Sequence, residues 1–223
     1  MPIAHNRTML RFGGLAALGM ATCYISMFIL FFGGVITIPP GSDTLTTLGY
    51  IQQGYLLIAT SYSIGYLLFG VLLAVLLQAL KHALPVHTSG LAGLADRFGG
   101  IWVVLMMATG MIYLIGLDRA IGLLNTDPEQ ANAVIQTVWL LGDALGGEIE
   151  LVGGLWVLLM SIAGLKHQRL PRALHWLGLM IGSVGILTLL HKVSALHAVF
   201  GLAQIVWFIW LGVALLCSKP ADE

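Results

Sequence analysis

The sequence predicts an all-α protein, a single integral membrane domain over residues 1–223 built as a bundle of six transmembrane helices. Mean hydropathy is +0.94, and 9% of the residues are charged, whereas soluble domains have about 25%. Several apolar runs are long enough to cross a hydrocarbon core about 30 Å thick, which takes about 20 helical residues. These observations exclude a water-soluble domain. Ten Lys and Arg balance ten Asp and Glu, so there is no basic excess and nucleic-acid binding is excluded too.

The six predicted helices are apolar runs bounded by charged residues, proline or glycine. They cover residues 12–38, 53–80, 98–117, 133–165, 173–191 and 194–217. The first run follows Arg7 and Arg11 and continues well beyond Cys23, so it is too long for a cleaved signal peptide. The second contains residues 71–80, which do not alternate between apolar and polar residues as a β-barrel strand would.

The third run lies between Arg97 and Asp118, while the fourth has 33 residues, from 133 to 165. A single helix of that length would be about 50 Å long, more than a bilayer requires. Gly146 and Gly147 are therefore predicted to break it near the outer boundary. Residues 148–165 then cross the membrane and residues 133–145 form an outer extension. The fifth and sixth runs are separated by a short turn at Lys192.

Basic residues are distributed unequally between the two sides that this topology defines. Eight of the ten fall on one side, and by the positive-inside rule that side, with both termini, is cytoplasmic. These eight are Arg7, Arg11, Lys81, Arg97, Lys166, Arg169, Arg172 and Lys219. Seven of the ten acidic residues fall on the other side, so the molecule is predicted to be basic inside and acidic outside.

Ionisable residues converge at the predicted outer ends of the third to sixth helices. An ionised side chain at the edge of the hydrocarbon is costly unless it is paired or hydrated, so Glu150 is expected to have a partner among Arg119, His191 and Lys192. The cluster is either a structural collar or a functional pocket. The candidate ligand-binding or proton-binding residues are Asp118, Arg119, Asp143, Glu148, Glu150, His191, Lys192 and His197.

Weaker polar signals lie within the predicted helices. Ser61, Tyr62, Ser63, Tyr66 and Gln204 are expected to form hydrogen bonds between helices, because an unpaired polar group is expensive there.

Gly178 and Gly182 form a GxxxG pair that allows a close helix approach, either within the chain or in a homodimer. Cys23 and Cys217 differ in depth by about 15 Å, so no disulfide is expected between them.

Motifs of the common soluble enzyme classes are absent: the sequence contains no GxSxG, HExxH, GxxxxGK or dinucleotide-binding glycine pattern. His191 and His197, with Glu150 and Asp143, are weak candidates for a zinc site in a membrane-embedded hydrolase. A haem held by His191 and His197 is weaker still, because that site would lie at the outer rim. No cofactor is identified by the sequence.

The C-terminal half carries a family resemblance. Residues 146–156 read GGEIELVGGLW, residues 170–172 read LPR, and Trp176, Leu177 and Gly178 follow. This combination resembles a bacterial multi-pass membrane family known as domain of unknown function 4386, over residues 140–212. The resemblance implies a bacterial inner-membrane protein and attaches no role to any residue.

Three functions remain open. The first is binding of a small or lipidic ligand, or of a partner subunit, through the outer polar cluster. The second is proton-coupled or ion-coupled transport, in which Glu150 and His191 or His197 would bind protons. A binding site in a secondary transporter usually has a helix broken at the midplane, and a break at the rim argues against transport. The third, a metal-dependent hydrolase, rests on the weak zinc candidates alone.

Overall fold

A computed structural model describes residues 2–33, 35, 37–39, 41–83, 90–147, 149–167, 170–190 and 192–218, with the side chains of residues 2–6, 32 and 167 left out. Every regular element in this part of the chain is helical, which confirms the predicted all-α class. The elements are α1 (Pro2–Phe32), α2 (Thr44–Gln53), α3 (Tyr55–Tyr62), the π-helical segment η1 (Ser63–Leu68), α4 (Phe69–Ala83), α5 (Gly90–Leu123), α6 (Pro128–Gly142), the π-helical segment η2 (Asp143–Gly147), α7 (Leu151–His167), α8 (Arg172–Leu187) and α9 (Ser194–Cys217).

Among the described residues, five helical stretches are long and apolar enough to cross a membrane. They are Arg7–Phe31, Tyr55–Ala83, Gly90–Leu123, Pro128–Lys166 and Ser194–Cys217. The remaining predicted span, 173–191, is observed as α8, an apolar helix of 16 residues that is shorter than these five. The last predicted helix, 194–217, has the observed bounds of α9.

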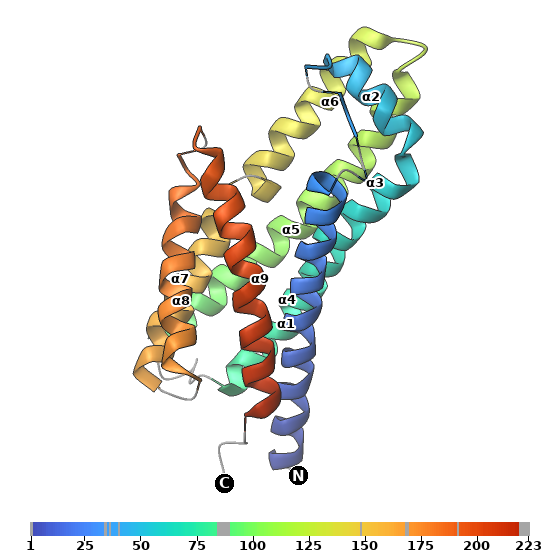
Figure 1. Cartoon of the computed structure of the whole chain (residues 1–223). Helices are drawn as coiled ribbons and strands as arrows, with labels where there is room; N and C mark the ends of the chain where they lie inside the picture. The colour runs from blue at the N-terminus through green and yellow to red at the C-terminus, as the bar shows by residue number, and fades with distance from the viewer. Residues whose placement is uncertain are drawn as a thin grey trace.

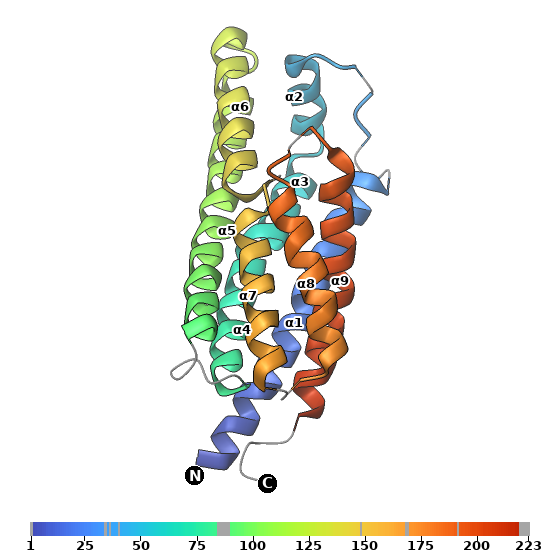
Figure 2. The ribbon, with the colours of Figure 1, turned by 90° about the vertical axis from the view of Figure 1, so that its left-hand side faces the viewer.

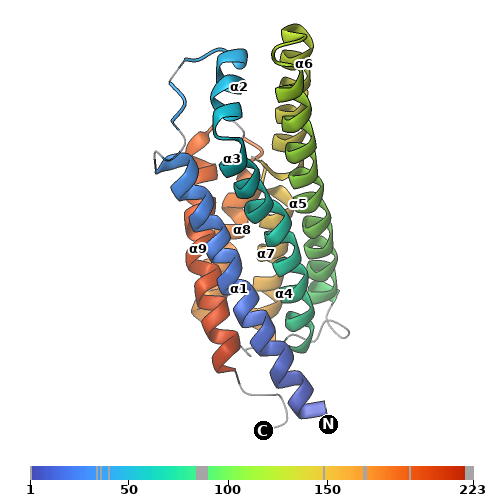
Figure 3. The same ribbon diagram turned by 90° about the vertical axis from the view of Figure 1, so that its right-hand side faces the viewer.

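The helices form a ring in which each leg packs on two neighbours. Helix α1 packs against α4 and α9, α5 against α4 and α7, and α8 against α7 and α9. Figure 2 shows α7 between α5 and α8, and Figure 3 shows α1 between α9 and α4. The start of α1 and the end of α9 lie at the same end of the bundle (Figure 1). Lys81, Arg97 and Lys166 also belong to helix ends on that side, which we call the basic end.

Aromatic side chains fill the middle of the ring. Neighbouring ring centroids are 5.4–6.5 Å apart, mostly in edge-to-face or tilted geometry, which suits the aromatic quadrupole. Five of the six helical legs contribute a side chain to this aromatic layer. The layer consists of Tyr24, Phe69, Trp102, Trp156, Trp207 and Phe208.

A second, smaller core holds together the end of the molecule opposite the basic end. There α2, α6 and the last turns of α5 project beyond α8 and α9 (Figure 2). Leu48 and Ile51 of α2 pack with Leu117 of α5 and Ile135 of α6, all four of them buried. Because α5 continues to Leu123, Asp118 and Arg119 do not end a helix, and that prediction is wrong.

The N-terminus of α2 is capped by Asp43, whose carboxylate Oδ1 accepts a hydrogen bond of 2.7 Å from the Thr46 backbone N–H. This hydrogen bond stabilises the ionised form and lowers the pKa of the Asp43 carboxyl below its ordinary value. The capping contribution is therefore present above the ordinary aspartate pKa and is lost as the pH falls through the lowered one. We expect hydrogen exchange at Thr46 and Thr47, corrected for intrinsic rates, to accelerate over that acidic range. The variant Asp43→Asn keeps an acceptor and cannot titrate, so the same acceleration in that variant would contradict this assignment.

Glycines allow α7 and α8 to approach within backbone contact. A Cβ atom at Gly154 would lie 2.8 Å from backbone atoms of Gly185 and Ile186, and one at Gly182 would lie 2.7 Å from the Gly154 carbonyl oxygen. Gly178 is likewise buried, against Ser161 of α7 and Trp207 of α9. The GxxxG face of Gly178 and Gly182 thus packs inside the chain, against α7 and α9, and the homodimer stays a prediction.

Candidate functional site

The predicted break at Gly146 and Gly147 is confirmed. Helix α6 passes into the wide turn η2, where Gly146 has φ 145° and ψ 14°, and α7 starts at Leu151. An L side chain rarely adopts such a positive φ, so glycine suits the position. A second π-helical segment, η1, interrupts the leg made by α3 and α4. Both segments pack against α5, and π-helical turns within helices are frequent at functional sites.

The break lies further from the end of the apolar stretch than the sequence suggested. A Cβ atom at Gly146 would lie 3.9 Å from Sδ of Met106, in the middle part of α5. On both sides of that level the exposed side chains of α5 are apolar, from Ile101 and Val104 to Met111 and Ile115. The break therefore faces the inside of the apolar stretch of α5. The break was expected at the rim because the third helix was predicted to end at residue 117, whereas α5 continues to Leu123.

Three tyrosines connect the two π-helical segments through α5. The Tyr113 hydroxyl donates a hydrogen bond of 2.8 Å to Oδ1 of Asp143, which begins η2. The Tyr113 ring stacks on Tyr62 at 4.7 Å and 15°, and it contacts Tyr66 of η1 at 5.4 Å. Gly142 and Gly147 leave room for the Tyr113 ring and hydroxyl on the side of the break. The Tyr113 phenol thereby helps to hold Asp143 in the interior.

Glu150 is the second interior carboxyl, at the N-terminal end of α7. Its backbone N–H donates a hydrogen bond of 2.9 Å to Oγ1 of Thr188, whose hydroxyl donates in turn to the Gly185 carbonyl. Its Oε2 atom is buried and has no hydrogen-bond partner among the residues that the structure describes. The carboxyl is close enough to the hydroxyls of Tyr24 and Tyr66 to act on them electrostatically. Glu150 thus points into the ring, toward α1 and η1.

The structure brings together only part of the predicted polar cluster. Asp143 and Glu150 are interior, whereas Asp118 and Arg119 are exposed on the projecting part of α5. Arg119 is 13 residues beyond Met106, about 20 Å along the helix, so it is too far away to pair with a group at the break. Lys192 is exposed beyond the end of α8, and no ion pair links it to Glu150 within the described residues.

Two of the predicted site residues, Glu148 and His191, lie outside the described residues. His197 is in the first turn of α9 as predicted, and its Nε2 atom is buried without a partner among the described residues. Within that same part of the chain, no three His, Cys, Asp or Glu side chains are grouped so that they could hold a metal ion. The zinc hypothesis for His191 and His197 therefore gains no ligand set from the described residues.

Tyr24, Tyr113 and Thr188 were not among the site residues predicted from the sequence. Tyr113 carries a hydroxyl in the middle of an apolar run, which is a polar signal of the kind noted for Tyr62 and Tyr66. Its partner Asp143 is 30 residues away in the sequence, so the pairing appears only once α5 and α6 lie side by side.

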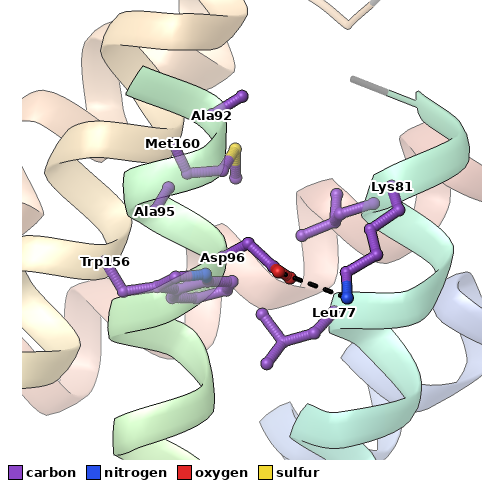
Figure 4. A pocket seen from close by; sticks show the side chains of 8 residues that line it. Leu77, Lys81, Ala92, Ala95, Asp96, Trp156 and Met160 are labelled. Atoms are coloured by element: carbon purple, nitrogen blue, oxygen red, sulfur yellow. Dashed lines mark ion pairs between the residues drawn. The ribbon is translucent and has the colours of Figure 1, made fainter. Parts of the chain in front are cut away.

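A small pocket lies on the basic side of the aromatic layer, between α4, α5 and α7 (Figure 4). Lys81 Nζ and Asp96 Oδ2 form an ion pair of 3.2 Å at this pocket, and Trp156 lines it from α7. Its volume is about 20 Å³, enough for a single water molecule. Trp156 therefore lies between the middle of the ring and a partly open, charged pocket near the basic end.

No protein family model matches the chain, and comparison with curated proteins and with solved structures finds no significant match. The resemblance to domain of unknown function 4386 stays a prediction. The candidate site thus rests on its own geometry.

Proposed function

We propose that the chain crosses a membrane six times and binds a small ligand inside its helix ring at Glu150. In this topology α8 spans the membrane in addition to the five longer stretches. Helix α8 packs between α7 and α9, and its 16 residues give about 24 Å, to which the turn after Leu187 adds. The start of α1 and the end of α9 share the basic end, which fits an even number of spans (Figure 1). The positive-inside rule supports a cytoplasmic basic end, in the inner membrane of a bacterium if the family resemblance holds.

The Glu150 carboxyl, whose buried Oε2 atom has no hydrogen-bond partner among the described residues, is the observation that carries this proposal. A carboxyl inside an apolar bundle is costly unless a cation, a hydrogen-bond donor or a proton satisfies it. The groups around it are the phenols of Tyr24 and Tyr66, and no Lys or Arg of the described chain forms an ion pair with it. A ligand that offers a hydrogen-bond donor or a positive charge would complete the site, and the helix N-terminus beside it favours the ionised carboxylate.

Coupled transport is the second candidate, and the position of the break favours it. The sequence predicted a helix break at the rim of the membrane, which argued against transport. In the structure Gly146 instead faces Met106, well inside the apolar stretch of α5. A helix interrupted inside the membrane is the usual binding element of secondary transporters. In this interpretation the aromatic layer would close the site on its cytoplasmic side. A partner subunit or a lipid remain alternative occupants that the following experiment separates.

Ligand binding can be tested by thermal unfolding of the detergent-solubilised protein with Glu150→Gln. The probes are ammonium, ethanolamine, choline, spermidine, neutral amino acids and oleate. We expect at least one probe to stabilise the wild type, by about 2.7 kcal/mol at 100 times its Kd, and to leave Glu150→Gln unchanged.

Asp118→Asn removes an exposed carboxyl and is the matched control, which should respond like the wild type. An equal response of wild type and Glu150→Gln to every stabilising probe would sink the assignment. No response to any probe would favour a partner subunit over a small ligand. Oleate alone would indicate a lipid.

A further inference from the structure

Buried polar side chains without partners are concentrated on one side of the ring. Within the described residues, eight such side-chain atoms belong to six residues. Only Thr109 is on α5, and the other five lie on α7, α8 and α9 or directly before α7. The six residues are Thr109, Glu150, Ser161, His175, His197 and Gln204. Uncompensated polar atoms in an apolar bundle are expensive, so the presence of five of these six residues on or beside three adjacent helices indicates a role beyond packing.

Contacts between the helices place these groups at successive depths. Glu150 is level with Thr188 at the end of α8, to which its backbone is hydrogen-bonded. Ser161 faces Gly178, and His175 faces Gly164. Thirteen residues of α8 separate Thr188 from His175, a rise of about 20 Å.

Gln204 lies between Glu150 and Ser161 in depth. On α9, Phe200 packs against Gly185, while the indole N–H of Trp207 donates a hydrogen bond of 3.2 Å to the Leu174 carbonyl. Gln204 is located between these two levels, on the same buried face of α9. The order from the break toward the basic end is therefore Glu150, Gln204, Ser161 and His175.

Two glycines make room for the polar groups on this line. The imidazole of His175 occupies the space that a Cβ atom at Gly164 would need, and the Ser161 hydroxyl occupies that of a Cβ at Gly178. His175 and Ser161 are both fully buried. An apolar side chain at position 161 or 175 would have been sufficient for helix packing, because both positions are fully buried.

We propose that Glu150, Gln204, Ser161 and His175 form a proton-transfer route along α7, α8 and α9, between the interior site and the basic end. The inference rests on the proposed function only in placing Glu150 at that interior site. A proton from the cytoplasmic side binds one ring nitrogen of His175, and the other nitrogen releases a proton toward Ser161. Water next to Ser161 and Gln204 passes it on, and the Glu150 carboxylate takes it up as a neutral carboxyl. No bond other than O–H and N–H bonds forms or breaks.

Distances and charges around the route fit this role. Four residues of α9 from Gln204 to Phe200 and three residues from Gly185 to Thr188 place Glu150 about 10 Å from Gln204 along the bundle axis, a gap that bridging water would span. Among the described residues, Tyr24 of α1 and Tyr66 of η1 lie within electrostatic range of the Glu150 carboxyl, and Thr188 accepts a hydrogen bond from the Glu150 backbone N–H. The groups that face His175 are uncharged residues of α7, and the nearby Lys166 and Arg172 are exposed. Trp156 and Trp207 fill the adjacent centre, so a proton can pass where a ligand cannot.

Charge movement after a pH jump tests the route without any substrate. Full-length protein in liposomes is adsorbed on a solid-supported membrane, the outside pH is stepped, and the transient current is recorded. We expect a transient in the wild type that Glu150→Gln abolishes. His175→Leu and Gln204→Met should reduce the displaced charge at least tenfold, and Ser161→Ala should slow its decay. Because His175→Leu could fail to fold, Gln204→Met and Ser161→Ala are judged independently, each with its thermal unfolding measured.

Ser183→Ala is the matched control for Ser161→Ala, since Ser183 is exposed on α8 and its hydroxyl is bonded to the Leu179 carbonyl at 2.8 Å. It should leave the transient unchanged. A wild-type current equal to that of protein-free liposomes overturns the route, and so do folded Gln204→Met and His175→Leu variants with the wild-type transient. A retained current with no ligand stabilisation would instead remove the interior binding site and leave the route standing.

Discussion

Trp156→Ala is expected to cause the largest loss of stability of any single substitution in this protein. The indole is 1% exposed and contacts Trp102, Trp207 and Phe208, with ring centroids 5.5, 5.6 and 6.5 Å away. In soluble cores, Trp→Ala costs about 3–5 kcal/mol, part of it for the cavity that remains. In a membrane the transfer part is smaller because the unfolded side chain meets lipid, but the packing part persists. We therefore expect a loss toward the lower end of that range.

Thermal unfolding in detergent measures this loss, at about 2–4 °C per kcal/mol for a chain of this size. Trp176→Ala is the matched control, because Trp176 is a tryptophan of the neighbouring helix α8 that is 61% exposed. It should change the unfolding temperature little. Equal effects of the two substitutions would mean that the aromatic layer does not hold the ring together.

Trp156→Ala should also change access to the interior. Trp156 belongs both to the aromatic layer and to the lining of the pocket beside Lys81 and Asp96 (Figure 4). Replacing Trp156 with alanine should therefore open a path from that pocket into the middle of the ring. A small thiol reagent added from the basic end is then expected to reach a cysteine introduced at Met106, in a background without Cys23 and Cys217. With Trp156 in place, that cysteine should stay unmodified from this side.

Hydropathy and glycine placement were sufficient to predict the class and most helices. The apolar runs predicted both ends of α9 correctly. The break at Gly146 was predicted because the run that contains it is too long for a bilayer. Helix ends were less predictable, because α5 continues past Asp118 once α2 and α6 supply an apolar partner for Leu117 and Ala120. That continuation depends on tertiary contacts, which cannot be predicted from the hydropathy of the sequence.

The site was only half predictable for the same reason. Asp143 and Glu150 were identified because carboxyls are rare in apolar runs. Their neighbours Tyr113 and Tyr24 come from other helices, and which helices meet depends on close approaches at glycines such as Gly13, which faces Ala79. Depth assigned by counting residues also placed Arg119 beside Glu150, an error that came from the length of α5.

Gly154→Ala is expected to be the second most damaging substitution, since it acts where the backbones of α7 and α8 are in contact. A Cβ atom there would lie 2.8 Å from the Gly185 backbone and 2.9 Å from the Gly182 carbonyl oxygen. Backbone atoms cannot rotate away as side chains do, so α8 would have to move off α7, and such overpacking costs about 1–3 kcal/mol. The shift would also lengthen the hydrogen bond from the Glu150 N–H to Thr188.

Gly154→Ala should therefore lower the unfolding temperature and also weaken the stabilisation by a ligand bound at Glu150. Gly100→Ala is the matched control, because Gly100 is helical and exposed on α5 with no atom within 4 Å of its added Cβ. Alanine is the better helix former, so that variant should be neutral or slightly more stable. If Gly154→Ala unfolds at the wild-type temperature, α7 and α8 are not in backbone contact. The position of Thr188 opposite Glu150 would then lose its structural basis.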